Sequence, residues 1–300
     1  MRVLISGATG YIGSELLRKL HSSAYIIRCL VRDPTKIRIP GNKLIEIYKG
    51  DLLSIETIQK AFAEVDVAFY LVHSMDSEKE FERLECDTAT NFARAAAESG
   101  VKRIIYLGAL GSDDEGILSS HLKSRKRVGN ILRSSGIQVI EFQASIILGA
   151  GSLSYEMIKA LSERLPVMIM PRWVGVKAQP IATTDVLEYL TQAIELKVDG
   201  NRIFEIGGPE QLSYKELIQE YCRQRSLKRL LIPVPVLTPW LSSLWLALVT
   251  PTFACVEKKL ILSIKNPTLV KDGSALSIFN TIKPMKVSEA IAIALRKNKK

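Results

Sequence analysis

Short apolar runs alternate with segments of helical spacing through the first half of the chain. The runs have the composition of strands buried on both faces, and they are residues 3–6, 26–31, 44–49, 65–71, 103–107 and 138–142. Between them apolar residues recur every three or four positions, which predicts helices over 12–21, 54–63, 80–99 and 119–134. Strands that alternate with helices are typical of a parallel sheet covered on both sides, so we expect a doubly wound α/β fold.

After about residue 150 this alternation becomes less regular. Helical spacing predicts helices over 152–164, 185–196 and 213–225 and a last helix from Val287, with extended pieces at 167–170 and 202–206. We therefore expect a sheet domain formed by residues 1–150. Residues 151–300 are expected to form a smaller mixed part that packs on this domain and covers a substrate.

The first predicted strand leads directly into Gly7-Ala8-Thr9-Gly10-Tyr11-Ile12-Gly13, where helical spacing begins. Gly7 allows a sharp turn, Gly10 allows the backbone to approach a pyrophosphate, and Gly13 allows the helix to pack closely on the strand. The N-terminus of the helix adds N–H groups and a partial positive charge. A strand, turn and helix with this glycine spacing predict a dinucleotide site, and the alternative is a glycine-rich turn without a ligand.

The net charge of +10 raises the question of an anionic macromolecular partner. Basic residues are mostly scattered, however, and they cluster only at 123–133, 223–229 and 296–300. No cluster alternates with aromatic residues as in single-strand binders, so we expect no nucleic-acid partner. A basic solvated surface is the favoured interpretation, and part of the charge can serve an anionic cofactor.

The chain has four cysteines, which are far apart in sequence, and three histidines. Without a C-x-x-C pair a structural zinc site is not expected, and free thiols are typical of a reducing cytoplasm. The first residues already form a strand, so we expect no secretory signal. We predict a cytoplasmic protein without a metal.

Residues 230–256 contain no charged residue, and four prolines interrupt them. The longest proline-free piece, residues 240–250, has eleven residues, whereas a membrane span needs about twenty. The segment is therefore predicted to line an apolar pocket or to join the core. The alternative is peripheral docking of Trp240–Val249 on a membrane face or on another protein.

Further motifs lie along most of the chain. They are Gly50-Asp51-Leu52, Asp66, Asn91, Gly100-Val101-Lys102-Arg103, Gln179-Pro180-Ile181, Asp185-Val186 and Ile206-Gly207-Gly208-Pro209. Together with the glycine segment, they make the chain resemble the short-chain dehydrogenase/reductase superfamily, in its extended and atypical branches with epimerase-like and NmrA-like proteins. The resemblance implies a Rossmann-type NAD(P)-binding fold and says little about the substrate.

The resemblance also implies roles for residues at the strand ends. Asp51 would accept a hydrogen bond from the adenine amino group with Leu52 against the ring, and the alternative is an aspartate that caps a turn or a helix. Arg32 offers a planar fork for a ribose 2′-phosphate, whereas Asp33 precedes a proline and can cap a turn. We therefore predict NADP(H) in preference to NAD(H), with Arg32 as a solvated loop cation as the alternative.

The fourth strand is followed by Leu71-Val72-His73. By resemblance, residues at this strand end lie beside the cofactor ribose and nicotinamide, so Leu71 and His73 are predicted cofactor neighbours. A strand-end histidine can also be a hydrogen-bonded structural residue.

The superfamily's reductases use a serine, a tyrosine and a lysine, and all three positions differ here. His121 occupies the tyrosine position, Arg125 occupies the lysine position, and the serine position falls in Leu107-Gly108-Ala109. His121 can act as a general acid or base, bind cofactor or substrate, or be a surface residue. Arg125, one turn later, can hold a ribose hydroxyl or an oxyanion but stays charged. Tyr155 is a second candidate proton donor, and its alternative is a packing residue.

Two classes of function remain. The glycine segment, and a second part long enough to form a pocket, favour an NAD(P)H-dependent oxidoreductase or epimerase-like enzyme with a small apolar substrate. The three altered positions favour a non-catalytic NADP(H)-binding sensor or an accessory or assembly protein. We favour the enzyme.

Overall fold

The computed structural model describes residues 1–39, 44–73, 81–111, 119–234 and 266–297. The chain forms two compact units. Unit 1 comprises Met1–Ala109, Ser124–Gln143 and Leu187–Phe204, and unit 2 comprises Leu110–Lys123, Ala144–Val186 and Glu205–Lys300. The units therefore interleave in sequence, and Leu187–Phe204 belongs to unit 1 although it follows the predicted boundary at residue 150. The predicted docking segment Trp240–Val249 lies outside the described residues.

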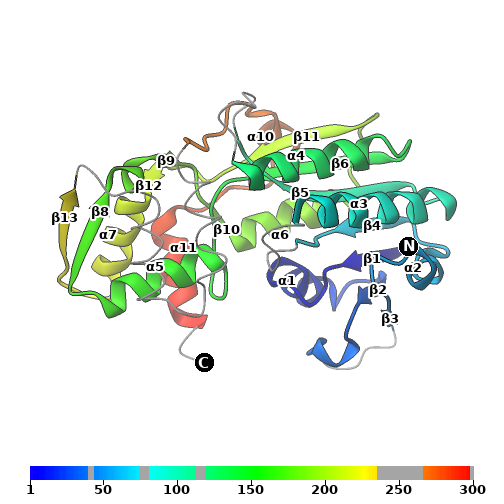
Figure 1. Cartoon of the computed structure of the whole chain (residues 1–300), viewed down its shortest axis with the longest axis horizontal. Coiled ribbons are helices and arrows are strands. Elements are labelled where there is room, and N and C mark those ends of the chain that lie inside the picture. The colour runs from blue at the N-terminus through cyan, green and yellow to red at the C-terminus, as the bar shows by residue number, and fades with distance from the viewer. Residues whose placement is uncertain (40–43, 74–80, 112–118, 235–265, 298–300) are drawn as a thin grey trace. The chain divides into compact units, whose positions relative to one another are not determined.

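Unit 1 is built on a seven-stranded sheet with the order β11-β6-β5-β4-β1-β2-β3 (Figure 1). The strands are β1 (Arg2–Ser6), β2 (Ile26–Val31), β3 (Ile45–Lys49), β4 (Val67–Tyr70), β5 (Arg103–Ala109), β6 (Gln138–Ala144) and β11 (Arg202–Ile206). The pairings of β1 with β2 and β4, of β2 with β3 and of β4 with β5 are parallel. The predicted doubly wound α/β fold is confirmed. The seventh strand, β11, comes from a piece that the sequence assigned to the second part.

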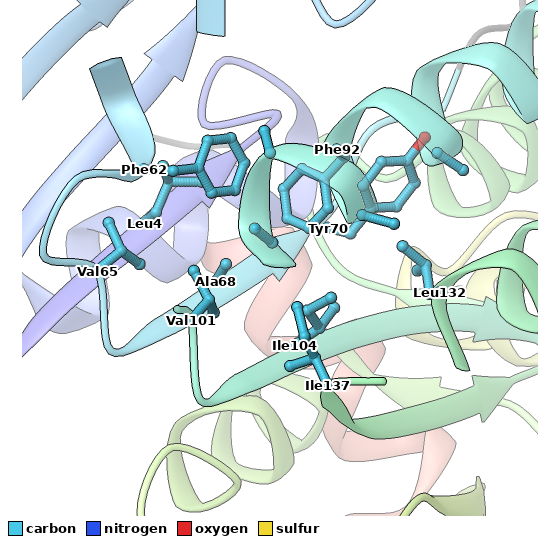
Figure 2. Packing of buried hydrophobic residues seen from close by; sticks show 14 of the residues in the cluster. Leu4, Phe62, Val65, Ala68, Tyr70, Phe92, Val101, Ile104, Leu132 and Ile137 are labelled. Carbon is cyan, nitrogen blue, oxygen red and sulfur yellow. The ribbon is translucent and has the colours of Figure 1, made fainter. Parts of the chain in front are cut away.

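The helices of this α/β arrangement follow the strands as the spacing predicts. They are α1 (Tyr11–Leu20), α2 (Ile55–Phe62), α3 (Phe81–Glu98), α4 (Ser120–Arg133) and α6 (Thr183–Gln192), with a short 3₁₀ turn η1 (Pro34–Lys36). Figure 2 shows the aromatic centre of one core layer, where the Phe92 ring lies 5.1 Å from Phe62 and 5.0 Å from Tyr70 between ring centroids. Both pairs meet edge to face, which is a favourable geometry for buried rings.

The Arg103 side chain, at the start of β5, connects the sheet to the segment that follows α6. Its guanidinium donates hydrogen bonds to the carbonyl oxygens of Ala193, Ile194 and Leu196 at 2.8, 3.0 and 2.6 Å. These carbonyls follow α6, where a helix end leaves acceptors without partners in the helix itself. A cation at this end also suits the helix dipole.

Unit 2 consists of helices and short strand pairs. The helices are α5 (Leu153–Arg164), α7 (Tyr214–Gln224), α10 (Ser274–Ile278) and α11 (Val287–Lys297), with a 3₁₀ turn η2 (Arg172–Gly175). The pairs are β7 (Ile147–Leu148) with β10 (Ile181–Ala182), β9 (Lys177–Ala178) with β12 (Leu212–Ser213), and β8 (Val167–Pro171) with β13 (Leu230–Val234). Apolar side chains of α5, α7 and α11 form one core with β8.

Among the described residues, no helix combines the length and the apolar character that crossing a membrane requires.

Candidate functional site

The glycine segment turns sharply between β1 and α1, and two of its glycines have no room for a side chain. Gly7 has a φ of +78°, and a Cβ placed there would lie 2.6 Å from the Leu71 carbonyl oxygen. A Cβ on Gly13 would lie 2.1 Å from the Gly7 carbonyl oxygen. The backbone conformation and the close approach of α1 to the turn therefore both depend on glycine.

Gly10 has a different environment from the other two glycines. A Cβ placed on Gly10 would meet only the Gly7 oxygen, at 3.2 Å, so the position is otherwise open. Gly10 is also the N-cap of α1 and contributes no capping side chain, and its own N–H donates to the Gly7 carbonyl at 2.9 Å. An open backbone at a helix N-terminus without a side-chain cap fits the pyrophosphate of a dinucleotide.

The residues predicted near the adenosine lie at the carboxyl ends of β2 and β3. Arg32 is exposed directly after β2. The Asp33 carboxylate accepts hydrogen bonds from the Thr35 hydroxyl at 2.6 Å and the Thr35 N–H at 3.1 Å, and these bonds lower the pKa of Asp33. Asp33 thus caps its own turn, which is the role that the sequence analysis considered for it. Asp51 accepts from the Leu53 N–H at 3.0 Å, and its role at the adenine stays a prediction.

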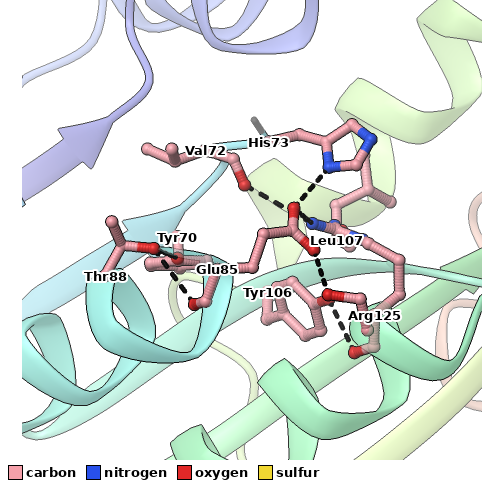
Figure 3. Close-up of polar contacts among 9 residues, drawn as sticks. Tyr70, Val72, His73, Glu85, Thr88, Tyr106, Leu107 and Arg125 are labelled. Atoms are coloured by element: carbon pink, nitrogen blue, oxygen red, sulfur yellow. Dashed lines mark hydrogen bonds and ion pairs between the residues drawn. The ribbon is translucent and has the colours of Figure 1, made fainter. Parts of the chain in front are cut away.

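A cluster of buried polar side chains lies at the carboxyl ends of β4 and β5 (Figure 3). Its centre is Glu85 of α3, whose side chain is 3% exposed. Nδ1 of His73 lies 2.6 Å from Glu85 Oε1, and Ser124 of α4 donates to Glu85 Oε2 at 2.5 Å. The Arg125 guanidinium lies 4.0 Å from Oε1. All of these residues belong to unit 1.

Arg125 also connects the ends of the two strands. Its guanidinium donates to the carbonyl oxygens of Leu107 and Val72, the latter at 3.4 Å, and its Cζ lies 4.9 Å from the centre of the Tyr106 ring. The Tyr106 hydroxyl in turn donates to the Arg125 carbonyl at 3.0 Å. A planar fork with several donors can satisfy two carbonyls and a ring face together, which a lysine cannot. The predicted roles of Arg125 toward cofactor and substrate stay predictions.

The charge of Glu85 fixes how His73 is protonated. Burial raises the pKa of Glu85, but the hydrogen bond and charge of His73, the charge of Arg125 and the hydrogen bond of Ser124 together lower it below its usual value. Glu85 is therefore an anion at neutral pH. An anion facing Nδ1 favours the tautomer that carries a proton on that nitrogen.

Sequence reasoning found His73 and Arg125 but not Glu85 or Ser124. A signal for Glu85 exists, because it lies four and seven positions before the buried residues Ala89 and Phe92. A carboxylate on the apolar face of a helix needs a buried partner. The sequence alone does not indicate which partner meets it.

The other two predicted catalytic residues, His121 and Tyr155, belong to unit 2. His121 is half-buried on α4, one turn before Arg125, and falls in unit 2. Tyr155 is fully buried in the core of unit 2, with its ring centroid 6.0 Å from that of Tyr221. This is the environment of a packing residue, the alternative that the sequence left open. Both roles in proton transfer stay predictions.

Unit 2 also contains an apolar cavity of about 350 Å³. Its lining comes from β8, η2, α7 and β13, and includes Met170, Pro171, Val174, Leu231, Pro233 and the cationic Lys215. Among the described residues, no group of three or more histidine, cysteine, aspartate or glutamate side chains is arranged to hold a metal ion.

Comparison with known proteins gives a consistent result for the first half of the chain. Residues 7–146 match the family model described as NAD(P)H-binding. Dihydroflavonol 4-reductase of Hordeum vulgare is 32% identical over 124 residues, which cover 37% of this chain and only 35% of that relative. Photosystem II assembly factor Ycf39 of Guillardia theta is 23% identical over 79% of this chain and 74% of its own length.

Among solved structures, NADPH-dependent quinone oxidoreductase QOR2 of Escherichia coli, complexed with NADPH, is similar over 97% of this chain and 98% of its own. The TM-score is 0.76 at 19% sequence identity. At this identity, the similarity establishes a shared fold.

Proposed function

We propose that this chain, whose residues 7–146 match a family model described as NAD(P)H-binding, is an NAD(P)H-dependent oxidoreductase with a small apolar substrate. The observation that carries the proposal is the pair formed by His73 and Glu85 at the carboxyl end of β4. In open α/β sheets this edge is where ligands bind. A titratable ring held by a buried anion is the kind of group that moves protons at such a site.

The nicotinamide cofactor, when bound, supplies or accepts the hydride. The residues of this chain bind and orient it. The turn from Gly7 to Gly13 would hold the pyrophosphate, and Leu71 would contact the neighbouring ribose. Arg125 keeps the ends of β4 and β5 together, so that His73 has a fixed place at the edge of the sheet.

The His73 ring, held by Glu85, exchanges a proton with the substrate. Glu85 accepts a hydrogen bond from Nδ1 and fixes the orientation of the ring. A histidine whose unperturbed pKa is about 6.5 can then carry a transferable proton near neutral pH. His121 and Tyr155 are the competing proton donors.

Replacing His73 by asparagine is expected to lower kcat for NAD(P)H-dependent carbonyl reduction by about 10²- to 10⁴-fold, because general acid catalysis contributes about that much. NAD(P)H should still bind to this variant, since the turn from Gly7 to Gly13 is unchanged. The measurement is NAD(P)H oxidation with a panel of aryl aldehydes and ketones, alongside a cofactor titration. The variant His21→Asn, at the end of α1, is the matched control.

His121→Asn and Tyr155→Phe complete this series. Normal turnover in His73→Asn together with a large loss in one of these two variants would transfer the role of proton donor to that residue. Normal turnover in all three variants would contradict the proposed proton transfer.

We also propose that NADP(H) is preferred over NAD(H). This preference is supported by the exposed Arg32 at the end of β2, beside an Asp33 carboxylate that is occupied by its own turn. An acid that holds the ribose 2′-hydroxyl would favour NAD(H), and a cation favours the 2′-phosphate.

Arg32→Ala should weaken NADPH binding by about tenfold to a hundredfold, the usual size of a lost charged hydrogen bond. NADH binding should stay the same, as should binding of both cofactors to the control variant Arg94→Ala, which removes an exposed arginine of α3. Fluorescence or thermal-shift titrations measure all of these. Equal affinities of the unaltered protein for NADPH and NADH would contradict the preference.

A second candidate function is a non-catalytic NAD(P)H-binding accessory or assembly protein. It is supported by the position of Arg125, whose guanidinium is engaged by two backbone carbonyls, and by the similarity to a protein named as an assembly factor. Tight cofactor binding without turnover on any substrate of the panel would favour this function.

A further inference from the structure

One face of the strand pair β8–β13 in unit 2 presents four large aliphatic side chains to solvent. In the parallel register, Leu230 pairs with Val167 and Ile232 pairs with Ile169. Their exposures are 60%, 46%, 40% and 38% in that order. Because alternate residues of a strand point to the same side, these four form one continuous surface. We call it the aliphatic strip.

The opposite face of the same pair is covered. Met168 and Met170 alternate with the exposed residues of β8, and both belong to the core that α5 and α7 build in unit 2. Parallel strands are normally covered on both faces, so a pair with one open aliphatic face is incomplete by itself. Contiguous exposed apolar surface of this kind marks a contact site.

Basic residues gather at one end of the strip. Arg164 precedes β8, and Lys228 and Arg229 precede β13. The two strands are parallel and begin side by side, with the Leu230 N–H donating to the Pro166 carbonyl at 3.0 Å. The three cations therefore flank the same end of the strip.

Carbonyl groups of α5 hold the side chain of Arg229, and the nearby acid, Glu163, has other partners. The Arg229 guanidinium donates to the carbonyls of Ser162 at 2.6 Å and Glu163 at 3.3 Å. The Glu163 carboxylate accepts from the Tyr221 hydroxyl at 2.7 Å and lies 3.5 Å from the Arg225 guanidinium. With Arg225 added to the three cations, four basic residues lie near the Glu163 carboxylate, and this end of the strip carries a net positive charge.

We propose that the aliphatic strip and its basic end dock this protein on an anionic membrane surface. Stable peripheral binding takes two signals, apolar insertion and attraction of basic residues to anionic lipid, and this face supplies both. The chain also continues beyond the strip without a charged residue as far as Val256. The docking goes beyond the proposed oxidoreductase function and brings the protein to the interface at which apolar substrates concentrate.

The test is flotation of the full-length protein with vesicles of phosphatidylcholine alone or with 30 mol% phosphatidylglycerol, a composition chosen for the experiment. Leu230→Thr/Ile232→Thr keeps residues that favour strands and removes the apolar surface, and we expect about tenfold weaker partitioning onto the anionic vesicles. Lys228→Gln should weaken partitioning about fivefold on anionic vesicles, with a smaller effect at high salt.

Matched controls come from other parts of unit 2. Leu276 of α10 is 52% exposed, and Lys283 is exposed, so Leu276→Gln and Lys283→Gln remove similar side chains away from the strip. Both variants should partition like the unaltered protein.

The proposal is overturned if the protein does not float with anionic vesicles, or if the strip and Lys228 variants float as well as the controls. It is also overturned if sedimentation without vesicles shows a dimer that the strip variant abolishes, since the face would then belong to a second copy. Binding of NAD(P)H is measured in parallel and should be the same in all of these variants, which separates this test from that of the proposed function.

Discussion

Replacing Gly7 by alanine is expected to lower the free energy of unfolding by about 3 kcal/mol or more and to abolish NAD(P)H binding. Two effects add at this position. The φ of +78° is unfavourable for any residue with a Cβ, and the new Cβ would lie 2.6 Å from the Leu71 carbonyl oxygen. Because this oxygen belongs to the backbone beyond β4, the clash is relieved only by moving the turn or the strand end.

Gly136 provides a control that separates these two effects. Its φ of +79° matches that of Gly7, but a Cβ there would have nothing within 4 Å. Gly136→Ala should therefore lower stability by only about 1 to 2 kcal/mol, the part due to backbone conformation. Denaturant unfolding followed by circular dichroism measures both variants. Equal losses in the two would show that the turn adapts to the added methyl group.

Glu85→Gln is expected to lower the free energy of unfolding by about 3 kcal/mol at pH 7. It leaves Arg125 buried without its nearby anion and presents an amide to the Nδ1 proton of His73. Glu82, on the same helix as Glu85, provides the control. It forms an exposed ion pair with Arg127, so Glu82→Gln should lower the free energy of unfolding by less than about 1 kcal/mol.

The difference in unfolding free energy between the unaltered protein and Glu85→Gln should depend on pH, because the pKa of Glu85 is lowered in the folded protein. A carboxyl group with a depressed folded pKa stabilises the protein above its unfolded pKa of about 4.3, and loses this contribution as pH falls through the folded value. The gap in stability between the unaltered protein and Glu85→Gln should therefore shrink between about pH 4 and the acid limit. A gap that stays constant through this range would contradict an anionic Glu85.

The sheet of unit 1 was predictable because most of its strands are apolar on both faces and its helices are apolar on one. Residues 26–31, for example, form β2 with the predicted bounds. The seventh strand was not predictable as part of the sheet. Arg202–Ile206 has a mixed pattern of exposed and buried residues, and its pairing with β6 joins segments about sixty positions apart.

The polar cluster shows a different limit of sequence reasoning. The location of His73 at a strand end follows from local pattern, and so does the one-turn spacing of His121 and Arg125. The meeting of His73, Glu85 and Ser124 depends on how α3 and α4 pack beside the ends of β4 and β5. No local pattern encodes such a contact between residues of separate helices and a loop.

The aliphatic strip could not be predicted from the sequence for a related reason. Val167, Met168, Ile169 and Met170 are all apolar, so the sequence lacks the alternation of polar and apolar residues that identifies a solvent-facing side. The structure separates the two buried methionines from the two exposed β-branched residues with which they alternate.

The contribution of Leu187–Phe204 to unit 1 affects how the protein is made. On the ribosome, the N-terminal strands are complete long before β11 emerges, so β6 remains an edge strand with unpaired backbone groups in the meantime. During that interval, Arg103 also lacks the three carbonyls that it binds in the finished protein. A fragment that ends near residue 150 would retain this state permanently. A single cut near residue 150 therefore separates the sheet from its last strand, and it leaves an edge of the kind that chaperones protect in nascent chains.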